Sequence, residues 1–111
     1  MDMEIVEKKV SDQRFILTVS GRLNAATAPQ LKSYVKKITE RNQPELILDL
    51  SGLVFMDSSG LAVFVSGMKS AREHGGWLKL AGVNSQVASV FKMTLLDRVF
   101  ELYPSVEEAG R

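Results

Sequence analysis

The chain has 111 residues, 45% of them hydrophobic and 24% charged, which is typical of globular domains rather than of disordered or membrane-spanning chains. A chain of this length holds one hydrophobic core, so we expect a single domain over residues 1–111. With a net charge of +1 and no cysteine, the sequence argues against nucleic acid and membranes as partners and excludes disulfides and thiolate-bound metals.

The N-terminal region predicts two strands. The segment RFILTVSG, residues 14–21, alternates apolar and polar residues, places Phe15, Leu17 and Val19 on one face, and ends at a glycine. The segment MEIVEKKV, residues 3–10, is a plausible partner strand. Because the start of the chain carries acids and no apolar run of signal-peptide length, we expect a cytoplasmic protein.

An amphipathic helix is predicted within residues 27–44, TAPQLKSYVKKITERNQP. Thr27 and Gln30 have the spacing of a capping box, and Pro29 stands in the first turn, where its missing N–H costs little. An apolar stripe then recurs at helical spacing, at Leu31, Tyr34, Val35 and Ile38.

The next strand and helix are joined by a polar stretch. ELILDL, residues 45–50, is short and aliphatic, the pattern of a strand that is buried on both faces. After the polar stretch, helical spacing returns, and HGG at residues 74–76 predicts the end of this second helix. The apolar positions of this helix are Leu61, Phe64, Val65 and Met68.

The rest of the chain continues the alternation. WLKLAG, residues 77–82, predicts a strand, and residues 84–93 predict a helix capped by Asn84. VFELY, residues 99–103, predicts a last strand, and residues 105–110 a short helix. Alternating strands and helices favour an α/β fold, in which helices cover a sheet that begins with an antiparallel hairpin.

The polar stretch lies in FMDSSGL, residues 55–61. Asp57 and Ser58 are good helix caps, and helix starts often need nothing more. Here, however, three polar residues precede Gly60, which costs about 1 kcal/mol in a helix relative to alanine. We therefore interpret the stretch as an exposed recognition surface or modification site, with Gly60 allowing close approach and with Leu50, Leu61, Val65 and Met68 buried.

Catalytic and metal-binding roles are not supported. A nucleophilic serine needs a general base, but the one histidine, His74, lies about 16 residues, or about 24 Å of helix, from Ser58. The nucleophile-elbow, Walker A and dinucleotide-binding motifs are absent. Asp49 has no clustered partners for a metal and is interpreted as structural. We expect no enzymatic activity, no cofactor and no metal.

Three segments resemble the STAS domain family, in its anti-sigma-factor antagonist branch. They are GRLNAATAPQL, LILDLSGLVFMDSSGLAVFVSG and FKMTLLDRVFELYPSVEEA, which are distributed from residue 21 to residue 109, so the match extends along essentially the whole chain. The resemblance implies the STAS fold, a mixed β-sheet of about five strands with an N-terminal antiparallel hairpin and about four covering helices.

The resemblance also implies a partner switch. In this family the first serine after the aspartate, here Ser58, is phosphorylated by an anti-sigma factor that is a GHKL-type serine kinase, and a PP2C-type phosphatase removes the phosphate. The unphosphorylated antagonist binds the anti-sigma factor, and the phosphorylated form releases it. The partner surface implied by the family comprises Asn24, Ala25, Met56, Asp57, Ser58, Ser59, Gly60 and Ala62.

One position departs from the family pattern, and one alternative stays open. Asn24 stands where some antagonists carry an acid, so this loop keeps hydrogen-bonding capacity but lacks a charge. The alternative function is a STAS accessory subunit of a transport or lipid-trafficking complex, which would bind its partner without phosphorylation. In either role we expect a monomer or a weak dimer.

Overall fold

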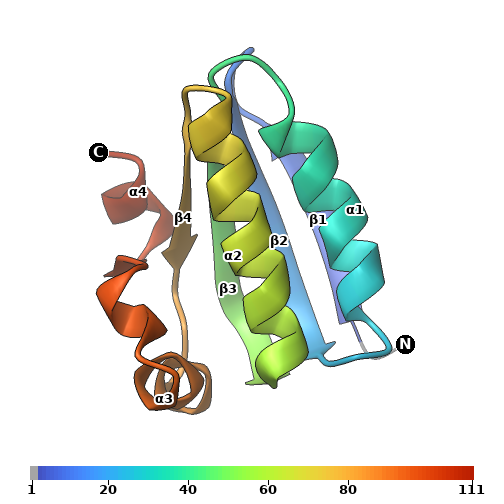
Figure 1. Ribbon diagram of the computed structural model, residues 1–111, viewed down its shortest axis with the longest axis vertical. Helices are drawn as coiled ribbons and strands as arrows, with labels where there is room; N and C mark the ends of the chain where they lie inside the picture. The colour runs from blue at the N-terminus through green and yellow to red at the C-terminus, as the bar shows by residue number, and fades with distance from the viewer. Residues whose placement is uncertain (1–2) are drawn as a thin grey trace.

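The computed structural model describes residues 3–111, which form one mixed sheet with helices packed on it (Figure 1). The strand order is β1-β2-β3-β4-β5; β1 is antiparallel to β2, and all other pairs are parallel. This confirms the predicted STAS-like architecture and its N-terminal hairpin. The elements are β1 (Met3–Lys9), β2 (Arg14–Leu23), α1 (Ala28–Thr39), β3 (Glu45–Met56), α2 (Ser58–Glu73), β4 (Trp77–Ala81), α3 (Ser85–Met93), the 3-10 helix η1 (Leu96–Arg98), β5 (Leu102–Tyr103) and α4 (Val106–Ala109).

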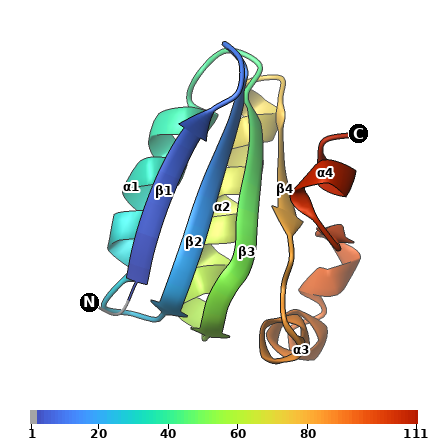
Figure 2. The same ribbon diagram turned by 180° about the vertical axis from the view of Figure 1, so that it is seen from behind.

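The main core lies between the sheet and the helices α1, α2 and α3. Leu17 of β2 and Leu48 of β3 are fully buried there. Phe91 of α3 stacks on Phe64 of α2 with ring centroids 6.1 Å apart, and it meets Phe100 edge-on at 5.7 Å. The view from behind shows β1, β2 and β3 in front of α1 and α2 (Figure 2). These two helices therefore cover one face of the sheet only.

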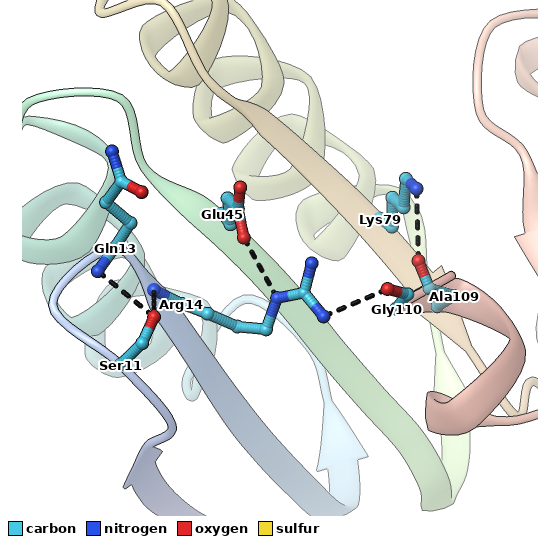
Figure 3. Close-up of polar contacts among 7 residues, drawn as sticks. All are labelled: Ser11, Gln13, Arg14, Glu45, Lys79, Ala109 and Gly110. Carbon is cyan, nitrogen blue, oxygen red and sulfur yellow. Dashed lines mark hydrogen bonds and ion pairs between the residues drawn. The ribbon is translucent and has the colours of Figure 1, made fainter.

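On the opposite face, α4 packs across β3 and β4. Figure 3 shows how polar side chains hold its end: Arg14 donates to the carbonyl of Gly110 at 3.0 Å and pairs with Glu45 at 2.9 Å. Lys79 donates to the carbonyl of Ala109 at 3.0 Å. Two cations thus satisfy the last carbonyls of α4, where positive charge is favourable.

Two strands extend beyond their predicted ends. The strand β2 continues past Gly21 to Leu23, with register shifts against β3 on both sides of Ser20 and Gly21. The strand β3 does not stop at residue 50 but runs to Met56. Gly52 lies within this longer strand and allows close approach of β2 and β3: a Cβ there would lie 2.8 Å from the Cβ of Ser20.

The predicted strand VFELY is mostly wrong, because only Leu102 and Tyr103 pair with β4. Val99 and Phe100 instead donate their N–H groups to the carbonyl of Leu96, which closes the turn after η1. The sequence could not distinguish a buried turn residue such as Phe100 from a strand residue.

The predicted burial of four apolar residues of β3 and α2 is largely confirmed, and so is the predicted cap of α3. Leu50, Leu61 and Met68 are buried, but Val65 is only half-buried at the rim of the core. The Asn84 side chain caps α3 by accepting from the N–H of Val87 at 2.9 Å. None of the helices in residues 3–111 is both long enough and apolar enough to cross a bilayer.

Candidate functional site

Two β–α junctions lie side by side at the carboxyl edge of the sheet, where α1 and α2 begin (Figure 1). Leu23 at the end of β2 is in register with Met56 at the end of β3. The N–H of Asp57 donates to the carbonyl of Leu23 at 3.2 Å, so the two chain segments are still joined where the strands end. Ligand sites of α/β sheets commonly lie at this edge.

The junction between β3 and α2 presents the Ser58 hydroxyl to solvent. Asp57 has extended backbone, and its carboxylate accepts from the N–H of Ser59 at 2.9 Å, which caps the helix. The helix therefore begins at Ser58, which is exposed. Within residues 3–111, no side chain or backbone group makes a hydrogen bond to the Ser58 hydroxyl. This confirms that the polar stretch is solvent-exposed at Ser58.

Gly60 has a different role from the one expected. It is buried, and a Cβ at this position would lie 2.6 Å from Cδ2 of Leu23 and 2.8 Å from Cγ of Met56. The glycine therefore allows the first turn of α2 to pack on the ends of β2 and β3. The interpretation that it leaves its backbone open to a partner is wrong, because the molecule's own side chains fill that space. Met56 is also buried.

The junction between β2 and α1 is a closed polar turn. The side-chain oxygen of Asn24 accepts from the N–H groups of Ala26 and Thr27, at 3.0 and 3.2 Å. The hydroxyl of Thr27 accepts from the N–H of Asn24 at 3.0 Å and donates to the carbonyl of Arg22 at 2.9 Å. The predicted capping box is therefore wrong: Thr27 makes no cap bond, because its hydroxyl bonds back to the turn.

A groove between α1 and α2 brings residues of both junctions together. It has a volume of about 470 Å³ and a mostly apolar lining. Ala25, Ser59 and Ala62, which the family pattern singles out, all line it, and Lys32 of α1 supplies a positive charge that the sequence did not reveal. The full lining is Ala25, Ala28, Pro29, Lys32, Ser59, Ala62, Val63 and Ser66.

The fold agrees with the comparisons with known proteins. A model of the STAS domain family matches residues 6–109. The chain belongs to the STAS domain family. The STAS domain here is 30% identical to the anti-sigma-B factor antagonist of Listeria monocytogenes over 102 residues, which cover 92% of this chain and 90% of that protein.

Solved structures show the same STAS fold. A putative anti-sigma factor antagonist from Thermotoga maritima superposes with a TM-score of 0.80 and 29% identity, covering 96% of this chain and 91% of that one. The unphosphorylated anti-sigma factor antagonist SpoIIAA superposes with a TM-score of 0.82 and 20% identity, covering 96% and 92%. Phosphorylated SpoIIAA from Bacillus has a TM-score of 0.74 at the same identity and covers 96% of both chains.

In this STAS domain, His74 and Asp49, the residues considered for catalysis and metal binding, make local contacts. Residues 3–111 contain no group of three or more acidic or histidine side chains placed to hold a metal ion. His74 follows the last residue of α2, at the opposite end of the helix from Ser58, and its Nδ1 lies 2.7 Å from the carbonyl of Ser70. Asp49 accepts from both the N–H and the hydroxyl of Ser51, consistent with a structural role.

Proposed function

We propose that this STAS domain is an anti-sigma-factor antagonist, a binding protein that holds an anti-sigma factor while Ser58 is unmodified and releases it once Ser58 is phosphorylated. The observation that carries the proposal is the Ser58 hydroxyl, which is exposed and unbonded within residues 3–111 at the first residue of α2. The names of the relatives, anti-sigma-B factor antagonist and anti-sigma factor antagonist, support the same assignment.

We infer the modifying enzymes from the resemblance to the antagonist branch of the family. A GHKL-type serine kinase, which is also the anti-sigma factor, transfers the γ-phosphoryl group of ATP to the Ser58 oxygen. The hydroxyl proton is lost and ADP leaves. A PP2C-type phosphatase then hydrolyses the phosphoester with water, which restores the hydroxyl and releases inorganic phosphate. We place this protein in the cytoplasm, and the proposal requires both enzymes to act there.

The proposed binding surface surrounds Ser58 on both junctions. Asn24, Ala25 and Ala62 are exposed or half-exposed, as are Asp57 and Ser59. The groove beside Ser59 offers an apolar recess for a side chain of the partner, and Lys32 on its rim favours an acidic neighbour. Met56 and Gly60 are buried beneath this surface and support it, because their packing fixes where the first turn of α2 lies.

The free energies indicate that the phosphate acts on the interface rather than on the fold. A phosphate on Ser58 lies at the N-terminus of α2, where the helix dipole favours it by at most about 1–2 kcal/mol. At an interface, the phosphate, which carries close to two negative charges, loses its water beside the negative charge of Asp57. Burying like charges next to each other in this way can cost several kcal/mol of binding free energy. A loss of about 3 kcal/mol weakens binding by about a hundredfold, enough to exchange partners.

Calorimetric titration against the GHKL-type serine kinases of the source organism, purified and tested in turn, checks the proposal. We expect unmodified protein and Ser58→Ala to bind tightly, and phosphorylated protein to bind about a hundredfold more weakly. Ser58→Asp should bind weakly as well, although its single charge is smaller than that of phosphate. Mass spectrometry of phosphopeptides after incubation with ATP should place the phosphate on Ser58 in wild type and in Ser59→Ala.

Three results would contradict the proposal. Equal affinity of the kinase for phosphorylated and unmodified protein would remove the switch. Phosphate found only on Ser59 would show that Ser58 is not the phosphorylation site. A protein that gains no phosphate yet binds a transport or lipid-trafficking complex through the same surface would be an accessory STAS subunit instead.

A further inference from the structure

The last part of β3 lacks a neighbouring strand on one side. Pairing between β3 and β4 ends at Asp49 and Ala81, whereas pairing between β3 and β2 continues to Met56. Successive residues of a strand direct their backbone groups to opposite sides. The final residues of β3 therefore turn half of their N–H and C=O groups toward an edge with no strand, where unpaired groups are costly if they are buried.

Side chains from the start of α3 take the place of that missing strand. Gln86 is the main substitute: its Oε1 accepts from the N–H of Met56 at 3.1 Å, and its Nε2 donates to the carbonyl of Met56 at 3.2 Å. Asn84 adds a bond from its Nδ2 to the carbonyl of Leu53 at 3.0 Å. A single carboxamide thus satisfies both backbone groups of Met56, as a paired strand would.

These bonds hold the peptide unit that leads into the acceptor serine. The carbonyl of Met56 and the N–H of Asp57 belong to the same planar peptide. Gln86 holds this unit through the Met56 carbonyl on one side, and the Leu23 carbonyl holds it through the Asp57 N–H on the other. Rotation of this plane would turn Asp57, which caps α2, and would redirect Ser58.

The helix that carries Gln86 is itself anchored firmly. Val87 and Phe91 of α3 are fully buried. The Phe91 ring stacks on Phe64 of α2, the helix that begins at Ser58. The Gln86 carboxamide is therefore presented from a fixed element and does not depend on a loop.

We propose that Gln86 is a positioning residue for the phosphorylation switch: its carboxamide fixes the Met56–Asp57 peptide and so sets the direction in which Ser58 is presented to the kinase. This inference rests on the proposed function for the role of Ser58, but the geometry it describes can be measured without a kinase.

The test compares Gln86→Met, which keeps the length of the side chain and removes both hydrogen bonds, with Thr39→Val. Thr39 is fully buried and donates to the Ser70 hydroxyl at 3.0 Å, so its replacement also removes an internal hydrogen bond, but at the far end of α1 and α2. Both variants should unfold at lower temperature than wild type. The comparison therefore separates a general loss of stability from a change at the acceptor.

In the isolated protein, we expect the Met56 amide of Gln86→Met to exchange with deuterium at least about tenfold faster than in wild type, because its acceptor is gone. The amide resonances of Asp57, Ser58 and Ser59 should shift. In Thr39→Val, these signals and the Met56 exchange should match wild type. Unchanged Met56 exchange and unchanged resonances in Gln86→Met would overturn the inference.

The second measurement uses ATP and the GHKL-type kinase that phosphorylates the wild-type protein. With this kinase, we expect kcat/KM for phosphorylation of Gln86→Met to be about tenfold lower than for wild type. Thr39→Val should stay within about twofold of wild type. Equal losses in both variants, or none in Gln86→Met, would also overturn it. If no kinase phosphorylates wild type on Ser58, the proposed function fails instead, and the amide measurements still decide whether Gln86 positions this peptide.

Discussion

At the junction between β2 and α1, the side chains of Asn24 and Thr27 bond the backbone of their own turn, whereas at the junction between β3 and α2 the Ser58 hydroxyl bonds nothing within residues 3–111. The two junctions are adjacent, and the Asp57 N–H bonds the Leu23 carbonyl between them. Similar polar residues therefore serve different purposes at two adjacent junctions.

The difference separates a supporting turn from a site available for chemistry. A polar side chain that satisfies its own backbone fixes a loop and has little capacity left for a partner. An exposed hydroxyl costs nothing in water. It can exchange its proton for a phosphoryl group without the loss of a hydrogen bond within the protein. The supporting contacts of Ser58 lie in the residues around it: the cap at Asp57 and the packing of Gly60 on Leu23 and Met56.

Gly60→Val tests whether the β3–α2 junction depends on close packing, and it should have the largest effect. A Cβ at Gly60 would lie 2.6 Å from Leu23 and 2.8 Å from Met56, so we expect a loss of about 3 kcal/mol in the free energy of unfolding, measured by urea denaturation. Ala62→Val, at an exposed position of the same helix, is the control and should cost about 0.5 kcal/mol. Similar losses for both would show that the first turn of α2 can shift to accept a side chain.

Asn24→Ala tests whether the β2–α1 junction is held by its polar side chain. It removes the acceptor for the N–H groups of Ala26 and Thr27, so we expect a loss of about 1.5 kcal/mol in the free energy of unfolding. Asn24→Asp retains an oxygen at the same place and should remain within about 0.5 kcal/mol of wild type. If Asn24→Asp were as unstable as Asn24→Ala, the turn would depend on the amide nitrogen and not on the oxygen.

Asp57→Ala removes the cap of α2 and should cost about 1 kcal/mol in the free energy of unfolding. The reason is the lost hydrogen bond from the N–H of Ser59 to the carboxylate. Chemical denaturation measures the change, and Asp57→Asn, which keeps a capping oxygen, should recover most of it. Full stability in Asp57→Ala would show that the pairing of the Asp57 N–H with Leu23 suffices to start the helix.

Ser58→Ala should have the smallest effect on stability, less than about 0.5 kcal/mol. Its hydroxyl is exposed and makes no hydrogen bond within residues 3–111, so nothing is lost from the fold. Thermal unfolding followed by circular dichroism measures the change. A loss of 1 kcal/mol or more would contradict the contrast between the two junctions, since Ser58 would then also be a structural residue.

Local patterns were sufficient for most of the helices. The stripe at Leu31, Val35 and Ile38 is buried in α1, and the Asn84 cap of α3 was evident from sequence spacing alone. Such features depend on residues within one or two helical turns of each other, so a short window of sequence contains the whole cause. The same reasoning placed Ser58 at an exposed helix start, because the polar residues that begin a helix tend to face water.

Strand ends were less predictable, because a strand is defined by its partners. The strand predicted over residues 45–50 continues to Met56, because the missing side chain of Gly52 allows Ser20 of β2 to approach. Thr27 and Gln30 have capping-box spacing, but the Thr27 hydroxyl bonds the carbonyl of Arg22 instead. In both cases a group outside the local pattern offers the better contact.

By itself, the sequence determined the alternation of strands and helices, the family resemblance and the position of Ser58 at the start of α2, since these depend on neighbouring residues. Only the tertiary structure decided that Gly60 is buried against Leu23, that the groove joins Ala25 to Ser59, and that Gln86 holds the peptide before Asp57. Each of these contacts joins residues about 30 or more positions apart. Such residues meet only when parallel strands align their carboxyl ends, and no local pattern in the chain specifies that alignment.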